Sequence, residues 1–155
     1  MATIEVVTAT LEHARRMASR TRRADREEVW ASHGVGAREA LALSLMASRE
    51  AWTGLVNGEP ACMFGVTPYP AEKGVGVPWM IGTDLVERHA AAFLRRNRSY
   101  VRHMLGVFPK LRNHVDARNE MSIRWLRWLG FTIHAAAPYG LYGLPFHLFT
   151  MESAR

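Results

Sequence analysis

Residues 111–131 read LRNHVDARNEMSIRWLRWLGF, and this stretch predicts a strand followed by a short helix with a sharp end. Apolar Leu111 and Val115 alternate with polar neighbours, which is the pattern of a half-buried strand. Asn119 is the expected helix cap, because an Asn side chain accepts hydrogen bonds from free amides of the first helical turn. Gly130 is expected to end the helix, because the left-handed conformation that closes a helix favours glycine. The stretch therefore predicts a sharply bounded strand-helix unit.

Length and composition favour a single domain spanning residues 1–155. The chain of 155 residues is long enough to bury a core, and its 48% hydrophobic content argues against disorder. No apolar run approaches the roughly 20 residues that cross a bilayer, and the amino terminus lacks the charged-then-apolar order of a signal peptide. We therefore expect a soluble, cytoplasmic protein. Cys62 is the only cysteine, which excludes an intramolecular disulfide and predicts a thiol packed in a strand.

The chain is basic, with a formal net charge of +6. Such a charge favours polyanionic partners such as nucleic acid or a phosphorylated cofactor, although charge alone selects none of them. Residues 20–26 form a dense basic run beside acidic residues. We expect this run to be an exposed helical surface rather than a nucleic-acid grip, because no aromatic residues are interleaved with its charges.

Periodicity and turn residues divide the remaining chain into strands and helices. Asn57 and Gly58 predict a tight hairpin, because this pair tolerates positive φ angles. One helix is expected after Thr8 or Thr10. A long helix is expected to be capped by Asp84 and to run towards Gly106. A further helix is expected at residues 37–47, and strands at residues 4–7, 51–56, 61–66, 77–82, 111–115, 132–137 and 146–151. This order predicts an α/β or α+β fold with antiparallel hairpins and one crossover helix.

Seven residues of the opening stretch form a motif, namely Asn119, Ser122, Ile123, Leu126, Leu129, Gly130 and Phe131. They resemble the carboxy-terminal motif of the GNAT N-acyltransferases, in which an Asn opens a helix and Gly-Phe leads into the penultimate strand. The resemblance implies a central mixed, mostly antiparallel sheet of about six to seven strands flanked by helices. It also implies acetyl-CoA as the cofactor, bound where two strands splay apart.

A closer resemblance is to the small GNAT-like internal virion proteins of short-tailed bacteriophages. It is carried by Trp79 before a Thr83 turn, a helix at residues 93–96, Asn113 with Val115, and the closing Leu148-Phe149-Thr150. This resemblance implies a role in the virion or its assembly, with other phage proteins or a polyanion as partners, in the host cytoplasm and in the particle. Nucleic acid is a further, less supported partner.

Two departures from the GNAT pattern bear on activity. Active members carry a Q/R-x-x-G-x-G/A loop whose amides approach a pyrophosphate, whereas residues 83–88 here read TDLVER. Asp84 and Glu87 place negative charge beside an incoming phosphate. Leu126 falls at the register of the tyrosine acid, and it cannot protonate a thiolate. Tyr100 or Tyr139 stays open as a substitute. We therefore expect a catalytically degenerate structural protein, with an active acetyl-CoA-dependent N-acetyltransferase as the alternative.

Candidate site residues follow from both hypotheses. For catalysis, His114 or Asp116 is the candidate general base. The resemblance implies that acetyl-CoA contacts Trp79, Met80, Ile81 and Asn119. A polyanion site, or a solvated face, is formed by one stripe of arginines on the long helix, namely Arg88, Arg95, Arg98 and Arg102. The seven histidines lack the helical pair and adjacent carboxylate of a zinc site, so no metal site is predicted.

Overall fold

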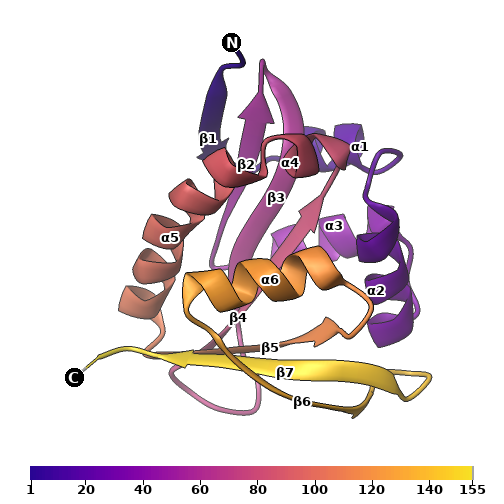
Figure 1. Ribbon diagram of the computed structural model, residues 1–155, viewed down its shortest axis with the longest axis vertical. Coiled ribbons are helices and arrows are strands. Elements are labelled where there is room, and N and C mark those ends of the chain that lie inside the picture. Colours follow the sequence, from indigo (N-terminus) through magenta and orange to yellow (C-terminus); the bar gives the residue numbers. More distant parts are fainter. Residues whose placement is uncertain (155) are drawn as a thin grey trace.

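A computed structural model describes residues 1–154, which form one seven-stranded sheet flanked by helices (Figure 1). The strand order is β1-β2-β3-β4-β5-β7-β6, and every neighbouring pair is antiparallel except β4 and β5, which are parallel. The predicted mixed, mostly antiparallel sheet is therefore confirmed. The strands are β1 (Ile4–Thr8), β2 (Glu50–Val56), β3 (Glu59–Pro68), β4 (Val75–Gly82), β5 (Lys110–Asp116), β6 (Thr132–Tyr139) and β7 (Leu144–Glu152).

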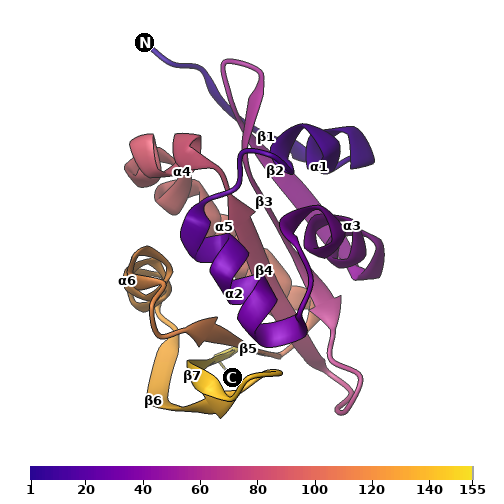
Figure 2. The same cartoon turned by 90° about the vertical axis from the view of Figure 1, so that its right-hand side faces the viewer.

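The helices lie in two groups on opposite faces of the sheet (Figure 2). On one face lie α1 (Leu11–Met17), α2 (Arg23–His33) and α3 (Ala37–Ala47). On the other face lie α4 (Asp84–Arg88), α5 (Ala90–Val107) and α6 (Glu120–Leu129). Each face has its own apolar cluster, centred on Phe93 under α5 and on Leu41 under α3. The sheet is thus buried on both sides.

Local turn chemistry explains the elements that the sequence predicts best. Asn57 and Gly58 have φ angles of 49° and 80°, so they form the expected left-handed hairpin turn between β2 and β3. Gly130 has φ 102° and closes α6, as predicted. Helix α3 occupies the predicted residues 37–47, and Cys62 is buried in β3.

The predicted long helix from Asp84 is wrong in two respects. His89, with φ −118° and ψ 29°, departs from helical geometry and divides the segment into α4 and α5. The cap is Thr83 instead of Asp84, because the Thr83 hydroxyl accepts the Leu85 amide at 3.2 Å. Thr83 is held at the end of β4 because its own amide donates to the Ala61 carbonyl at 2.8 Å.

The parallel pair β4 and β5 separates soon after it begins. Only Val75 with Lys110 and Gly76 with Leu111 are in register, although both strands continue for several residues. Beyond Gly76, the main-chain groups of β4 that point away from β3 have no partner strand among the described residues. The structure therefore opens a wedge between the strands that the resemblance expected to splay.

Candidate functional site

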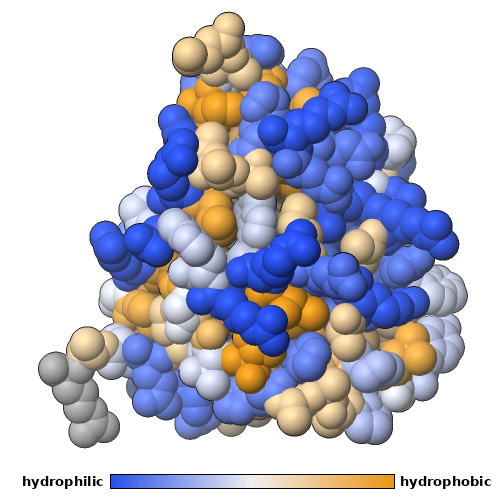
Figure 3. Space-filling view, in the orientation of Figure 1, coloured by the Kyte–Doolittle hydropathy of each residue, from blue (hydrophilic) through white to orange (hydrophobic). Residues whose placement is uncertain are grey.

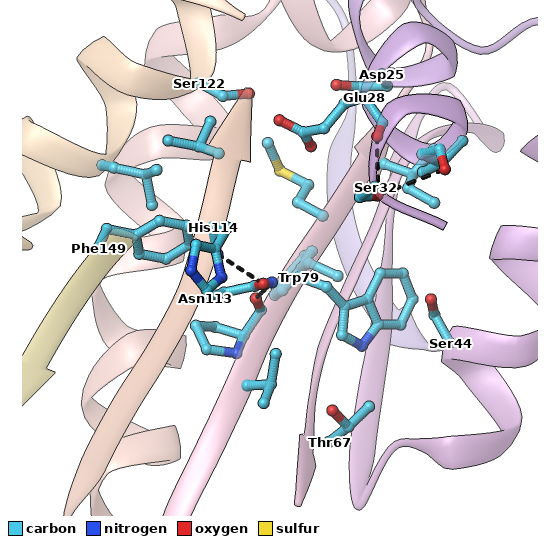
Figure 4. A pocket seen from close by; sticks show the side chains of 18 of the residues that line it. Asp25, Glu28, Ser32, Ser44, Thr67, Trp79, Asn113, His114, Ser122 and Phe149 are labelled. Atoms are coloured by element: carbon cyan, nitrogen blue, oxygen red, sulfur yellow. Dashed lines mark hydrogen bonds between the residues drawn. The ribbon is translucent and has the colours of Figure 1, made fainter. Parts of the chain in front are cut away.

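The wedge between β4 and β5 opens into a cavity of about 690 Å³. Residues of both strands line it, together with residues of α2 and α3 on one face of the sheet and of α5 and α6 on the other. The cavity therefore passes through the sheet. Figure 4 shows Asp25 and Glu28 at one end of the pocket and Thr67 at the other, with Trp79 and His114 between them.

The side chain of Asn113 bridges the wedge where main-chain pairing has stopped. Its amide nitrogen donates to the Pro78 carbonyl of β4 at 2.7 Å, and its oxygen accepts the His114 amide at 2.7 Å. Since alternate residues of a strand direct their main-chain groups to the same side, the N–H and C=O of Met80 also face the wedge. Asn113 thus links the two strands midway along the cavity, and among the described residues no strand pairs with Met80 on that side.

A second unpaired group reaches the cavity from α5. Asn97 is only 6% exposed and lines the cavity, yet its side-chain oxygen has no hydrogen-bond partner among the described residues. Its amide nitrogen lies 4.0 Å from the sulfur of Met80, which is a weak acceptor. A buried carboxamide with so few partners costs stability, and a ligand amide in the cavity would satisfy it.

The open end of the wedge is closed by charged residues at the start of α2. Arg22 is 5% exposed and Asp25 is 3% exposed, and the guanidinium donates to the Asp25 carboxylate at 2.9 Å. Arg22 also donates to Glu87 of α4 at 2.6 Å. The expectation that residues 20–26 form an exposed surface is therefore wrong for Arg22 and Asp25, because this ion pair and its further hydrogen bonds compensate their burial.

Asp25 binds the end of β4 directly. Its carboxylate accepts the Gly82 amide at 2.8 Å, and the Arg22 amide donates to the Gly82 carbonyl at 2.8 Å. A Cβ at position 82 would lie 2.6 Å from Val86 Cγ1, so only glycine allows this close approach. The segment before α2 thus takes the place beside β4 that β5 has left.

The amides that follow β4 are also used within the chain. The Thr83 amide binds the Ala61 carbonyl, the Leu85 amide binds the Thr83 hydroxyl, and the Val86 amide binds the Thr83 carbonyl at 3.1 Å. With Gly82 bound to Asp25, four of the amides at this turn have internal acceptors. An incoming anion would have to displace these bonds.

Glu28 lies one helical turn beyond Asp25 and lines the cavity. Its carboxylate accepts the main-chain amide of Asp116 at 2.8 Å. Burial, followed by the negative charge of Asp25, raises the pKa of Glu28 to about 8. Burial also raises the pKa of Asp25, against the opposing charge of Arg22. Glu28 is therefore a carboxyl group that can exchange a proton near neutral pH.

The two candidate general bases have different surroundings. His114 lines the cavity and stacks on Tyr139, with 3.7 Å between ring centroids, and burial followed by the charge of Arg112 lowers the pKa of His114. Asp116 is 1% exposed and does not belong to the cavity lining. It accepts hydrogen bonds from the Arg118 guanidinium at 3.0 and 2.7 Å. The structure places only His114 where a ligand in the cavity would reach it.

Of the four residues that the resemblance implies for cofactor binding, three line the cavity and one does not. Trp79, Met80 and Ile81 line the cavity, and the Trp79 indole is fixed by a 2.7 Å bond to Ser48. Asn119 is 1% exposed and lies outside the lining. It stands at the N-cap position of α6, as predicted, but its side chain makes no capping hydrogen bond, so the predicted bond to the first helical turn is wrong. The side-chain amide of Asn119 instead donates to the Asp25 carboxylate at 3.1 Å.

The predicted arginine stripe is exposed. Arg88 lies on α4, and Arg95, Arg98 and Arg102 lie on α5. None of the four forms an ion pair within residues 1–154. The Arg98 guanidinium packs 3.9 Å from the ring centroid of Trp128, joining α5 to α6. Figure 3 shows this face, where strongly hydrophilic side chains lie over α5 and α6.

Three aromatic or apolar positions bear on the missing acid. Leu126, at the register of the tyrosine, lines the cavity, as do Tyr100 and Tyr139. Tyr100 packs against Trp52 and Phe64, with ring centroids 4.8 and 5.3 Å away. Burial raises the pKa of Tyr139. Both tyrosines that the sequence offers as a substitute acid therefore line the cavity.

Sequence reasoning missed Asp25, Glu28 and Asn97 as site residues. In the sequence these residues would be recognised only as polar side chains on the buried face of a helix. The alternating charges of α2 give no clear apolar face, so the sequence does not show which face of α2 is buried. Within residues 1–154 no group of three His, Cys, Asp or Glu side chains is arranged to hold a metal ion. In the same residues no helix has both the length and the apolar character needed to cross a membrane.

No protein-family model matches the chain, and no curated protein sequence matches it either. Solved structures do match. A protein from Acinetobacter baylyi assigned to the acetyltransferases aligns with a TM-score of 0.73 at 14% identity, covering 99% of this chain and 94% of that one. An acetyltransferase of the GNAT family from Streptococcus pneumoniae aligns with a TM-score of 0.65 at 12% identity, covering 97% and 100%.

A third match is a Salmonella typhimurium protein solved with its cofactor acetyl-CoA. It has a TM-score of 0.67 at 14% identity, covering 96% of this chain and 93% of that one. Identities this low establish shared architecture and leave activity open. Together with the strand order and the wedge, these matches identify the fold of the chain as the GNAT fold.

Proposed function

We propose that this chain is a GNAT-fold protein that has lost acetyl transfer and serves as a structural or assembly component of a bacteriophage particle. One observation carries the first half of the proposal, namely that the amides at the end of β4 are bonded within the chain. The Asp25 carboxylate accepts the Gly82 amide, the Thr83 hydroxyl accepts the Leu85 amide, and the Thr83 carbonyl accepts the Val86 amide. The position at which the fold would hold a pyrophosphate already contains a carboxylate.

The surrounding charges oppose a nucleotide for the same reason. Asp84 and Glu87 are exposed at this turn, and Glu87 is the partner of Arg22. A pyrophosphate here would meet two carboxylates and compete with Asp25 for the guanidinium. The residues present therefore do not fit the nucleotide part of acetyl-CoA. Leu126 in the cavity removes the usual acid as well. The phage assignment is supported by the motif resemblance and by the exposed arginines.

We expect calorimetric titration with acetyl-CoA and desulfo-CoA, at low and moderate salt, to give no saturable heat. S-acetyl-pantetheine serves as the control, because it lacks the nucleotide and needs only the cavity. Tight binding of acetyl-CoA that persists at moderate salt would contradict the proposal, since salt screens adventitious binding to surface arginines.

For the second half, the chain is expected in particles or assembly intermediates of the phage that encodes it, at a fixed copy number. Quantitative mass spectrometry of purified particles and intermediates measures this. Absence of the chain from both would exclude a virion or assembly role.

An active N-acetyltransferase is the second candidate, and the cavity favours it. The cavity crosses the sheet, and it holds Glu28, whose raised pKa of about 8 suits a group that takes a proton from an amine. His114, which lines the same cavity, is a second candidate base. Acetylation of an amine that is lost in Glu28→Gln, with the fold intact, would favour this candidate over the structural role.

The arginine stripe gives a further prediction. Replacing both Arg95 and Arg98 with Ser is expected to lower the salt concentration at which the chain elutes from heparin, because neither guanidinium has a carboxylate partner within residues 1–154. The matched control replaces both Arg15 and Arg23 with Ser. It removes the same number of positive charges, but these two arginines already pair with Glu12 and Glu27. Equal shifts for the two double variants would mean that only net charge matters.

A further inference from the structure

Arg112 is a half-buried cation at the end of the cavity opposite Glu28. It lies on β5, close to the residues where β4 and β5 still pair. Its Nη1 donates to the hydroxyl of Tyr69 at 2.6 Å, and the guanidinium lies 4.6 Å from the centroid of the Tyr69 ring. Tyr69 is itself fixed, because its amide binds the Val75 carbonyl at 2.9 Å. The guanidinium is therefore held in one orientation.

This guanidinium has spare hydrogen-bonding capacity. An Arg side chain carries five N–H donors, and the bond to Tyr69 is the one side-chain hydrogen bond that Arg112 makes within residues 1–154. In the same residues it forms no ion pair. It is also the one Lys or Arg in the lining that these residues provide. A ligand anion in the cavity would pair with this half-buried guanidinium through its remaining N–H donors.

The positive charge of Arg112 affects two other titratable groups in the cavity lining. It contributes to lowering the pKa of His114, and it opposes the rise in the pKa of Tyr139. Between Arg112 and Glu28 the wall consists largely of apolar and aromatic groups, including Trp79, Met80 and Val77. A ligand that suits this wall has an apolar body and one charged end.

We propose that Arg112 anchors the carboxylate of a small amphipathic ligand whose apolar body lies along β4 in the cavity. A planar guanidinium pairs with a carboxylate through two parallel hydrogen bonds. A single negative charge matches the single cation, whereas a phosphate dianion would leave one charge unmatched. This site is independent of acetyl transfer, because it uses neither the turn after β4 nor the position of the missing tyrosine.

The test uses 4-phenylbutyrate and its neutral isostere 4-phenylbutyramide as probes, titrated by calorimetry. We expect saturable binding of the carboxylate and at least about tenfold weaker binding of the amide, because only the carboxylate pairs with the guanidinium. In Arg112→Gln the preference for the carboxylate is expected to disappear. Backbone amide NMR shifts should map the probe to Tyr69, Trp79 and His114.

Two variants separate binding from folding. Arg124→Gln removes an exposed arginine of α6 outside the cavity lining and should leave the carboxylate affinity unchanged. Tyr69→Phe keeps the aromatic contact, frees Nη1 and should retain the preference. Equal affinity for the carboxylate and the amide, or undiminished carboxylate binding by a folded Arg112→Gln, would overturn the proposal. So would the absence of saturable carboxylate binding to the unmodified chain.

Discussion

Replacing Arg22 with Gln is expected to lower the free energy of unfolding by about 3–5 kcal/mol, the usual cost of removing one partner of a buried ion pair. Arg22 and Asp25 are 5% and 3% exposed, so the remaining carboxylate would stay buried without its cation. Among residues 1–154, Asp25 would keep only the hydrogen bonds from the Gly82 amide and the Asn119 side chain. The same substitution also frees Glu87 of α4. Chemical denaturation at pH 8 measures the loss.

The controls for this prediction come from the same helix. Arg23→Gln removes a guanidinium whose side chain is 85% exposed, and its loss should stay below about 1 kcal/mol. The double variant R22Q/D25N should lose less than the sum of the single losses, because no lone charge remains. A loss below about 1 kcal/mol for Arg22→Gln itself would mean that Asp25 is solvated rather than dependent on its partner.

Replacing Glu28 with Gln is expected to stabilise the chain at alkaline pH. In the folded chain the pKa of Glu28 is raised to about 8, whereas an unfolded Glu titrates near 4.5. The folded state therefore binds more protons between these values, and the stability that this protonation provides is present below pH 4.5 and lost as pH rises through 8. The loss has a ceiling of about 1.4 kcal/mol per pH unit.

Gln removes this titration while keeping an oxygen that can accept the Asp116 amide. The unfolding free energy of Glu28→Gln should thus exceed that of the parent chain at pH 9, and the difference should shrink towards pH 5. Urea denaturation at intervals of one pH unit measures it. Glu27→Gln, which removes a carboxylate that pairs with Arg23 elsewhere on α2, is the matched control for the loss of one negative charge. A constant difference between Glu28→Gln and the parent chain would contradict a raised pKa at this position.

Much of the fold could be predicted because it depends on local chemistry. Asn57-Gly58 and Gly130 require left-handed backbone, and that requirement is visible in the residue type alone. The strands adjoining the hairpin and helix α3 have hydrophobic patterns that any partner surface would bury. The break at His89 has no such local signal, and Thr83 becomes the cap only because a contact with β3 holds it in place.

The site was less predictable because its residues depend on contacts between distant segments. Asp25 and Asn119 are 94 positions apart and meet only after α2 closes the wedge. Residue type alone predicts Asn119 as the cap of α6. Its side-chain amide donates to Asp25 instead and makes no hydrogen bond to the first turn of the helix. Arg112 and Tyr69, 43 positions apart, likewise meet only across the sheet. His114 was found because it alternates with apolar residues on a strand.

The short pairing of β4 with β5 also determines how the molecule would respond to tension. The amino-terminal strand β1 belongs to the four-stranded part of the sheet and the carboxy-terminal β7 to the three-stranded part. A force pulling the two chain ends apart would therefore load the boundary between these parts. There the ladder pairing of described residues is limited to Val75–Lys110 and Gly76–Leu111, reinforced by the side chain of Asn113. This boundary is a mechanically weak seam, at which the sheet would part before its long antiparallel ladders give way.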